Sequence, residues 1–159
     1  MQIRDILREK ATGSVTTNSG QSIHDAITTL NKHRIGALVV LDKGEEVVGI
    51  ITERDILRTC GEQCGGLNEP LKTKGTTCSS LVDDAMTRDL VIGVPEDDPN
   101  YVMGVMTKNR IRHLPILDGR SLAGMISIGD LVNLHLEEKV FESRTLKDYL
   151  KGIGKLKPV

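Results

Sequence analysis

The chain has 159 residues, of which 38% are hydrophobic and 27% charged, an ordinary balance for a globular protein with a core of its own. Its 21 lysines and arginines nearly cancel its 22 aspartates and glutamates, so the net charge of -1 gives no field that would attract nucleic acid or an anionic membrane, and we expect neither as a partner. Because the chain begins without an apolar run of signal-peptide length and contains no stretch of 18 apolar residues, we expect a cytoplasmic protein.

Residues 22–33 have the spacing of an amphipathic helix. Ser22 followed by Asp25 is a capping box, in which each side chain accepts a hydrogen bond from the backbone N–H of the other residue. The apolar residues of this segment fall on one helical stripe: Ile23, Ala26, Ile27 and Leu30. We therefore expect this helix to cover one face of a core.

Two apolar runs follow this helix. Residues 37–41 and 47–51 are rich in β-branched residues, are too short for helices and are separated by turn-forming residues, so they predict a hairpin with both strands buried. Thr52 then begins a second helix that we expect to extend to about Cys60. Since a short strand precedes the first helix, the predicted order is strand, helix, strand, strand, helix.

The same order is repeated once. Segment 33–42 (HRIGALVVLD) corresponds to 109–118 (NRIRHLPILD) at an offset of 76 residues, and segment 49–56 (GIITERDI) corresponds to 124–131 (GMISIGDL) at an offset of 75. A repeat of this length predicts two similar units that pack on each other. We expect four segments: 1–66 as the first unit, 67–80 as a linker, 81–135 as the second unit and 136–159 as a C-terminal helical extension.

The second unit contains features that the first lacks. Asp98 and Pro99 predict the start of its first helix, because a proline in the first turn loses no hydrogen bond. Pro115 indicates an edge strand or a bulge. After Asp130 no proline or glycine interrupts the chain up to residue 150, and a 20-residue helix spans about 30 Å. The apolar residues of this long helix predict contact with another subunit: Leu131, Leu134, Val140, Phe141 and Leu150.

The repeated motif has two readings. Thr52 with Asp55, and Ser127 with Asp130, fit helix caps that stabilise a helix start by about 1 kcal/mol. A glycine three residues before each hydroxyl, however, permits close approach of a ligand, the hydroxyl at the helix start can donate to a phosphate, and the aspartate can accept from two ribose hydroxyls. The residues alone leave both readings open.

With its two glycine-to-aspartate motifs and two matching central strands, the chain resembles a tandem pair of cystathionine-β-synthase (CBS) domains, a Bateman module. It is most similar to stand-alone bacterial CBS proteins related to the regulatory region of IMP dehydrogenase. The resemblance implies an α/β fold of two units with pseudo-two-fold symmetry and two clefts between them, plus the long C-terminal helix. It also implies a homodimer and an adenosine-containing ligand such as AMP, ADP, ATP, NAD or S-adenosylmethionine.

The family pattern assigns roles to residues of this chain. The ribose-binding aspartates are Asp55 and Asp130. The phosphate contacts are Thr52, Ser127, Arg112 and His113, with Arg54 as the only nearby cation of the first unit. The base pocket is lined by Val15, Thr16, Thr17, Ile92, Gly93 and Val94. Because Gly36 and Ala37 stand in the first unit where Arg112 and His113 stand in the second, we expect the Asp130 cleft to be the better phosphate site.

The resemblance implies a regulatory, nucleotide-sensing module, and the alternative is an interaction protein with vestigial clefts. An enzyme is the weakest of the three classes, because the sequence has no catalytic triad in suggestive order, no CxxC and no P-loop. We expect no metal site, because two ligand types lack metal-site spacing: the cysteines Cys60, Cys64 and Cys78, and the histidines His24, His33 and His135.

Overall fold

The computed structural model describes residues 1–10, 13–43, 45–63 and 80–153, with side chains described up to 145. Residues 67–79 of the expected linker, Cys64, Cys78 and the residues after 153 lie outside this part. The elements in chain order are α1 (Ile3–Glu9), β1 (Thr16–Asn18), α2 (Ile23–His33), β2 (Ala37–Leu41), β3 (Val47–Thr52), α3 (Glu53–Gln63), α4 (Val82–Ala85), α5 (Pro99–Asn109), β4 (His113–Asp118), β5 (Ser121–Ser127) and α6 (Ile128–Ile153).

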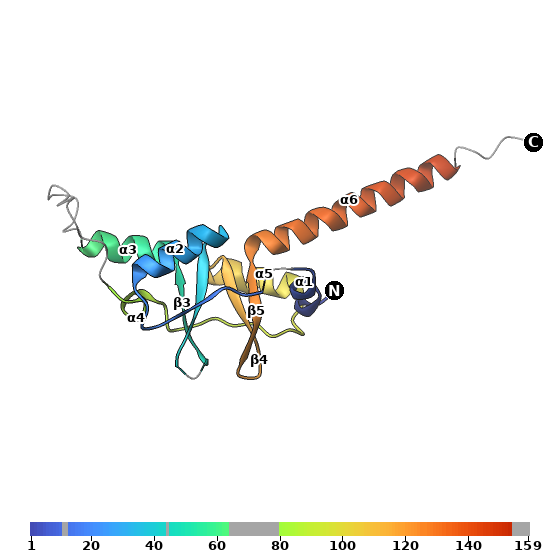
Figure 1. The fold of residues 1–159 in the computed structure, drawn as a ribbon. Coiled ribbons are helices and arrows are strands. Elements are labelled where there is room, and N and C mark those ends of the chain that lie inside the picture. The colour runs from blue at the N-terminus through green and yellow to red at the C-terminus, as the bar shows by residue number, and fades with distance from the viewer. Residues whose placement is uncertain (11–12, 44, 64–79, 154–159) are drawn as a thin grey trace, which may run out of the picture.

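The first unit has the predicted order of strand, helix, strand, strand and helix. β1 pairs in parallel with β2, and β2 pairs antiparallel with β3, which gives a three-stranded sheet. Figure 1 shows α2 and α3 beside this sheet. Ser22 caps α2 as expected, because its hydroxyl accepts a hydrogen bond of 3.1 Å from the Asp25 N–H.

The second unit repeats this arrangement with a smaller sheet. β4 and β5 form an antiparallel pair, and the strand expected before α5 is reduced to one bridge between Gly93 and Ile116. It is short because the chain turns directly after Gly93: the Val94 N–H donates to the Asp97 carboxylate at 2.8 Å, and Pro95 has no N–H to offer. The register of β4 shifts between Ile116 and Leu117, which confirms the irregularity expected beside Pro115.

The two units exchange their opening helices (Figure 1). α1 packs into the core of the second unit through Ile3 and Ile6, whereas α4 packs into the core of the first through Val82 and Ala85. The exchange is nearly symmetric in its hydrogen bonds as well, since the Ile3 N–H donates to Asp97 O at 3.0 Å and the Val82 N–H donates to Gln21 O at 2.8 Å. This exchange makes the repeat one body with pseudo-two-fold symmetry.

The exchange also explains the glycine of each repeated motif. A methyl group at Gly124 would lie 2.5 Å from Leu7 of α1, and a methyl group at Gly49 would lie 2.6 Å from Met86 Sδ and 3.0 Å from Thr87 O. The space beside these glycines is thus filled by the exchanged segments. The expectation that they also admit a ligand stays a prediction.

Replacing Gly49 by alanine is expected to lower the free energy of unfolding by about 1–3 kcal/mol, because overpacking costs that much where backbone has to move. Urea unfolding followed by circular dichroism measures the change. Gly104 is the control, since nothing lies within 4 Å of a methyl group there and alanine favours the interior of α5 by about 0.5–1 kcal/mol. Equal effects of the two substitutions would contradict the packing role of Gly49.

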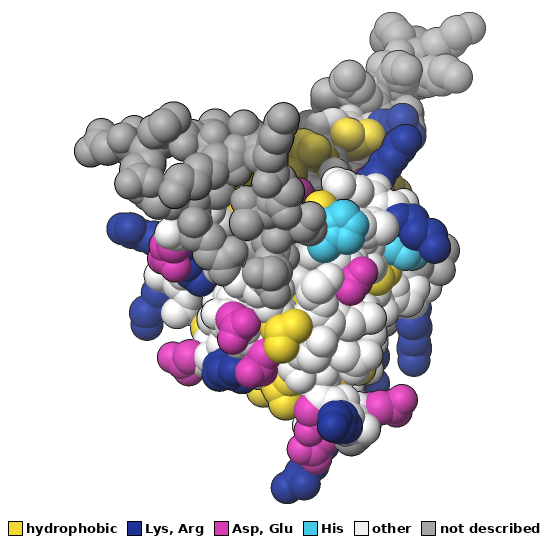
Figure 2. All heavy atoms as spheres, turned by 60° about the vertical axis from the view of Figure 1, so that its left-hand side comes forward, with side chains coloured by type: hydrophobic (Ala, Val, Ile, Leu, Met, Phe, Trp, Pro, Cys, Tyr) yellow, Lys and Arg dark blue, Asp and Glu magenta, His cyan; other side chains and the backbone are white. Residues whose placement is uncertain are grey.

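α6 is the longest element, with 26 residues, and it confirms the predicted C-terminal helix. It begins against the second core through Leu131 and Leu134, makes contact with α5, and then extends away from the rest of the molecule (Figure 1). Leu136 and Phe141, farther along, are 58% and 72% exposed. In the described part of the chain, no helix is long and apolar enough to cross a membrane. Basic and acidic side chains are interspersed on the face shown in Figure 2.

Candidate functional site

Both repeated motifs form reciprocal helix caps. In the first, the Thr52 N–H donates to Asp55 Oδ2 at 2.9 Å and the Asp55 N–H donates to Thr52 Oγ1 at 3.3 Å. In the second, the Ser127 N–H donates to Asp130 Oδ2 at 2.7 Å and the Asp130 N–H donates to Ser127 Oγ at 3.3 Å. The capping role predicted for these residues is confirmed. Their surroundings, however, differ.

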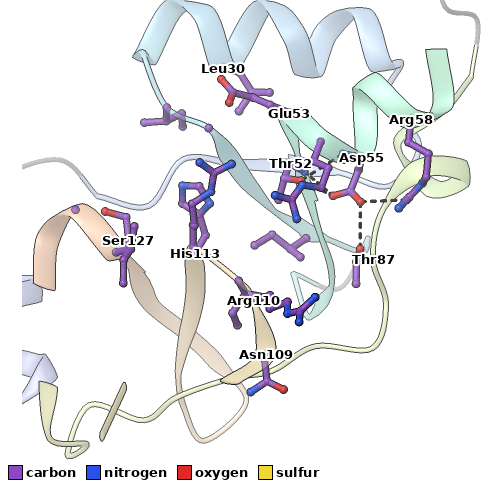
Figure 3. Close-up of a pocket in the computed structure, with 18 of the residues that line it drawn as sticks. Leu30, Thr52, Glu53, Asp55, Arg58, Thr87, Asn109, Arg110, His113 and Ser127 are labelled. Atoms are coloured by element: carbon purple, nitrogen blue, oxygen red, sulfur yellow. Dashed lines mark hydrogen bonds and ion pairs between the residues drawn. The ribbon is translucent and has the colours of Figure 1, made fainter. Parts of the chain in front are cut away.

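A cavity of about 900 Å³ lies between the two units, and we call it the Asp55 cavity. Thr52 and Asp55 face it from the start of α3 in the first unit. His113 at the start of β4 and Ser127 at the end of β5 face it from the second unit (Figure 3). The N-termini of α3 and α6 therefore converge on one cavity, and each helix N-terminus favours a negative charge.

The walls of the Asp55 cavity are rich in positive charge. His113 and five arginines contribute to the lining, against two carboxylates, Glu53 and Asp55. The arginines are Arg34, Arg54, Arg58, Arg110 and Arg112. Arg34 and Arg110 occupy equivalent positions after α2 and α5, and both adopt a left-handed backbone conformation, with φ of 52° and 55°. The arrangement is suited to an anion with several oxygen acceptors.

The Asp55 carboxylate is buried, and both of its oxygens accept hydrogen bonds, but from different partners. Its Oδ2 accepts from Thr52, whereas its Oδ1 accepts from Arg58 at 3.1 Å and from the Thr87 hydroxyl at 3.3 Å (Figure 3). The Arg58 side chain is 55% exposed, so it is able to move away without being buried elsewhere. Oδ1 is thus the oxygen that ligand hydroxyls could reach.

His113 lies at the boundary between the two units. A methyl group at Gly36 of the first unit would lie 3.3 Å from His113 Cε1, so the glycine makes room for the imidazole. Burial lowers the pKa of His113 from its ordinary value, and the positive charges of Arg112 and Lys10 lower it further. The imidazole is therefore largely neutral at pH 7 and offers one N–H and one lone pair.

Asp130 lines neither this cavity nor a second, smaller one. Lys10, at the end of α1, places its Nζ 2.6 Å from Asp130 Oδ2 and 3.1 Å from Met125 O. Burial raises the pKa of Asp130, but hydrogen bonds from Lys10 and Ser127 outweigh that effect, so the pKa is lowered overall. Asp130 is therefore a charged carboxylate in an ion pair with Lys10.

The smaller cavity, about 120 Å³, is lined by Lys10, and we call it the Lys10 cavity. It is the pseudo-symmetric counterpart of part of the Asp55 cavity. His33 and Ile35 line it where Asn109 and Ile111 line the larger cavity, at an offset of 76, and Met125 replaces Ile50 at an offset of 75. The two predicted clefts are both present, but they differ in size.

The predicted phosphate contacts come together, although in a different place from the one expected. Arg112 and His113 line the Asp55 cavity, together with Thr52, Ser127 and Arg54. The expectations that they serve the cleft of Asp130, and that Arg54 is the only cation near Asp55, are wrong. The reason is that the His113 side chain, at the start of β4, lies beside Gly36 of the first unit, which the sequence does not display.

The predicted base-pocket residues are dispersed. Val15 lines the Lys10 cavity, and Thr17 is buried with its hydroxyl donating to Gln21 Oε1 at 2.5 Å. Four others line neither cavity: Thr16, Ile92, Gly93 and Val94. The aliphatic walls of the Asp55 cavity come instead from Leu30, Ile35, Ile50 and Ile111.

Several residues at these cavities were missed from the sequence. Arg58 follows Asp55 by three positions, a spacing that places both on one helix face and could have revealed it. Arg34 and Arg110 each follow a predicted helix and are matched by the repeat at an offset of 76 residues, which could have revealed them. Thr87 and Lys10 reach their aspartates over 32 and 120 residues, and no local pattern marks such pairs.

Metal ligands do not gather in the described residues. No group of three or more histidine, cysteine or acidic side chains there could hold a metal ion. Both ring nitrogens of His135 have hydrogen-bond partners within the protein: they lie 3.0 Å from Leu131 O and 2.9 Å from Asn100 Oδ1. Cys60 packs against the core of the first unit.

Comparison with known proteins agrees with this architecture. The CBS domain model matches residues 3–62 and 82–137. The mitochondrial CBS domain-containing protein CBSX3 of Arabidopsis thaliana is 35% identical over 158 residues, which cover 94% of this chain and 72% of that protein. The crystal structure of the CBS-domain protein ATU1752 from Agrobacterium tumefaciens is 35% identical, covers 83% of this chain and 91% of that one, and has a TM-score of 0.72.

A third similar structure is a complex. The CBS domain pair of MJ0100, solved with 5'-methylthioadenosine and S-adenosyl-L-methionine, is 25% identical, covers 85% of this chain and 99% of that one, and has a TM-score of 0.70. The family match covers more than half of the chain, in two copies, and the exchanged helices and paired cavities follow the same repeat. The chain belongs to the CBS-domain family and is a tandem CBS pair with a C-terminal helix.

Proposed function

We propose that this CBS pair is a sensor that binds a phosphorylated adenosine compound, such as AMP, ADP, ATP or NAD, in the Asp55 cavity. One observation carries the proposal: a single cavity between the units joins a buried carboxylate, two helix N-termini and five arginines. The ligands of the MJ0100 pair support the adenosine part of this proposal, and the arginines of the cavity support the phosphate part.

Each part of the cavity suits one part of a nucleotide. Asp55 Oδ1 accepts from the ribose hydroxyls once Arg58 moves aside. The phosphates lie against Thr52 and Ser127 at the two helix starts. Arg54 and Arg112 add positive charge there, and His113 adds a neutral N–H donor. The base packs on the aliphatic walls, chiefly Ile50 and Ile111.

The mechanism we propose is linkage rather than chemistry. Because both units line the cavity, a ligand there stabilises one relative arrangement of the units, and it shifts that equilibrium by no more than its differential affinity for the two arrangements. The carboxylate of Asp55 is already occupied as a hydrogen-bond acceptor in the cap, which suits binding better than proton transfer. We propose a regulatory role without catalytic activity and, from the sequence, a cytoplasmic location.

A panel of ligands tests this proposal. In a thermal-shift experiment with AMP, ADP, ATP, NAD and S-adenosylmethionine, at least one compound is expected to stabilise the chain. At 100 times its dissociation constant a ligand adds about 2.7 kcal/mol, or roughly 5 to 10 °C for a protein of this size. If no compound shifts the melting temperature, the chain is not a sensor of these ligands.

The exposed face of α6 favours a second role in self-association. Val132, Leu136 and Val140 are spaced four residues apart, so they share one face of the helix, and they are 45%, 58% and 49% exposed. Monomeric proteins rarely expose a continuous apolar stripe of this kind. We propose that this face pairs with a second copy of the chain to give a homodimer.

Replacing Leu136 by aspartate is expected to convert the dimer into a monomer, because a charge would then have to be buried in the centre of the apolar stripe. Size-exclusion chromatography with light scattering measures the mass. Leu81, which is 42% exposed and lies outside α6, is the control, and Leu81→Asp is expected to remain dimeric. A wild-type chain that is monomeric at all concentrations would refute the homodimer.

A further inference from the structure

The two motif aspartates contact very different neighbours, although they are equivalent in the repeat. Beside Asp55 lies Thr87, whose short side chain donates to Oδ1 at 3.3 Å and leaves the carboxylate on the cavity wall. Beside Asp130 lies Lys10, whose ammonium group donates to Oδ2 at 2.6 Å. Lys10 is one of the ten residues that line the smaller cavity, and Asp130 is not among them. A lysine thus stands between this aspartate and the cavity.

Thr87 and Lys10 contact equivalent strand residues, Thr87 through its backbone and Lys10 through its side chain. Ile50 and Met125 are equivalent residues of β3 and β5. Ile50 exchanges two backbone hydrogen bonds with Thr87, of 3.0 Å and 2.8 Å. Met125 O instead accepts from Lys10 Nζ at 3.1 Å. In the second unit, a long charged side chain therefore replaces both the backbone bridge and the threonine hydroxyl of the first.

We propose that Lys10 determines the binding specificity of the two clefts by closing the second one, so that each chain binds one nucleotide, in the Asp55 cavity. At Asp55 a ligand has to displace only Arg58, whose side chain is 55% exposed. Lys10 is 33% exposed and is held by Met125 O as well as by Asp130 Oδ2, so it is harder to displace. The volumes agree with this inference, since about 120 Å³ remains in the Lys10 cavity and about 900 Å³ in the Asp55 cavity.

This inference rests on the proposed function. Substitutions of Lys10 test the inference separately from the proposed function. The Lys10 and Asp130 side chains are 33% and 21% exposed, so Lys10→Met leaves Asp130 in contact with water instead of burying an unpaired charge. Methionine also keeps the length of the apolar stem. Lys10→Arg retains the positive charge, and Arg8→Met removes an exposed charge from the same helix, so these two variants are the controls.

Isothermal titration calorimetry with AMP, ATP and NAD measures the number of sites. We expect one site in the wild-type chain, in Lys10→Arg and in Arg8→Met. In Lys10→Met we expect a second site, at least about tenfold tighter than any second site of the wild type, as the loss of a charged hydrogen bond implies.

Two results would overturn the role of Lys10 while leaving the proposed function intact. One is two sites of similar affinity in the wild type, which decides the matter even if Lys10→Met does not fold. The other is a single site in a Lys10→Met chain whose melting temperature is unchanged. Absence of binding in every variant would instead contradict the proposed function and this inference together.

Discussion

Replacing Asp55 by asparagine is expected to weaken nucleotide binding about 100-fold. The variant keeps the shape of the side chain, and its amide oxygen is still able to accept from the Thr52 N–H. It loses, however, the charged oxygen that now accepts from Arg58 and Thr87 and that we assign to the two ribose hydroxyls. Each hydrogen bond to a charged group contributes about 1.5–3 kcal/mol. Calorimetry with the best ligand of the panel measures the loss.

Asp130→Asn is the matched control for this experiment. Asp130 caps its helix in the same way, but it lines neither cavity and is paired with Lys10. We expect its affinity for nucleotide to stay within about twofold of wild type. If instead Asp130→Asn abolished binding and Asp55→Asn did not, the assignment of the ligand to the Asp55 cavity would be refuted.

Arg112→Gln is expected to weaken the binding of AMP much more than the binding of adenosine. Arg112 lines the cavity beside His113, and removing one charge-assisted contact to a phosphate costs about 10- to 100-fold in affinity. Adenosine lacks the phosphate, so its affinity is expected to remain within about twofold. Competition binding of AMP against adenosine gives the ratio directly.

The control for Arg112 is Arg120→Gln. Arg120 is 92% exposed at the tip of the second hairpin, where its only described ion pair is with Glu46 at 3.6 Å, so this variant changes the net charge by the same amount without touching the cavity. Equal losses of AMP and adenosine in Arg112→Gln would show that the residue supports the fold and not the phosphate.

Local features of the fold were predictable from the sequence. The Ser22, Thr52 and Ser127 caps, the two hairpins and the irregularity at Pro115 all depend on residues within a few positions of each other, and each is present. The sequence repeat also showed which residues of the two units are equivalent. Together these observations were sufficient to predict the CBS pair.

Long-range features were not predictable. The exchange of α1 and α4 depends on which core their apolar side chains fill, and the motif glycines make room for two of these side chains, Leu7 and Met86. The position of Arg112 and His113 depends on Gly36, across the boundary between the units. Similarly, the pairing of Lys10 with Asp130 spans 120 residues. The structure brings the predicted phosphate contacts to one cavity, but the aspartate in that cavity is Asp55, where the sequence favoured Asp130.

A crystal structure of the chain with the tightest ligand of the panel tests the central claim most directly. We predict the ribose within hydrogen-bond distance of Asp55 and the phosphate against Arg112 and the two helix starts, with Arg58 moved away from the carboxylate. Adenosine bound at Asp130 while the Asp55 cavity stays empty would contradict the account.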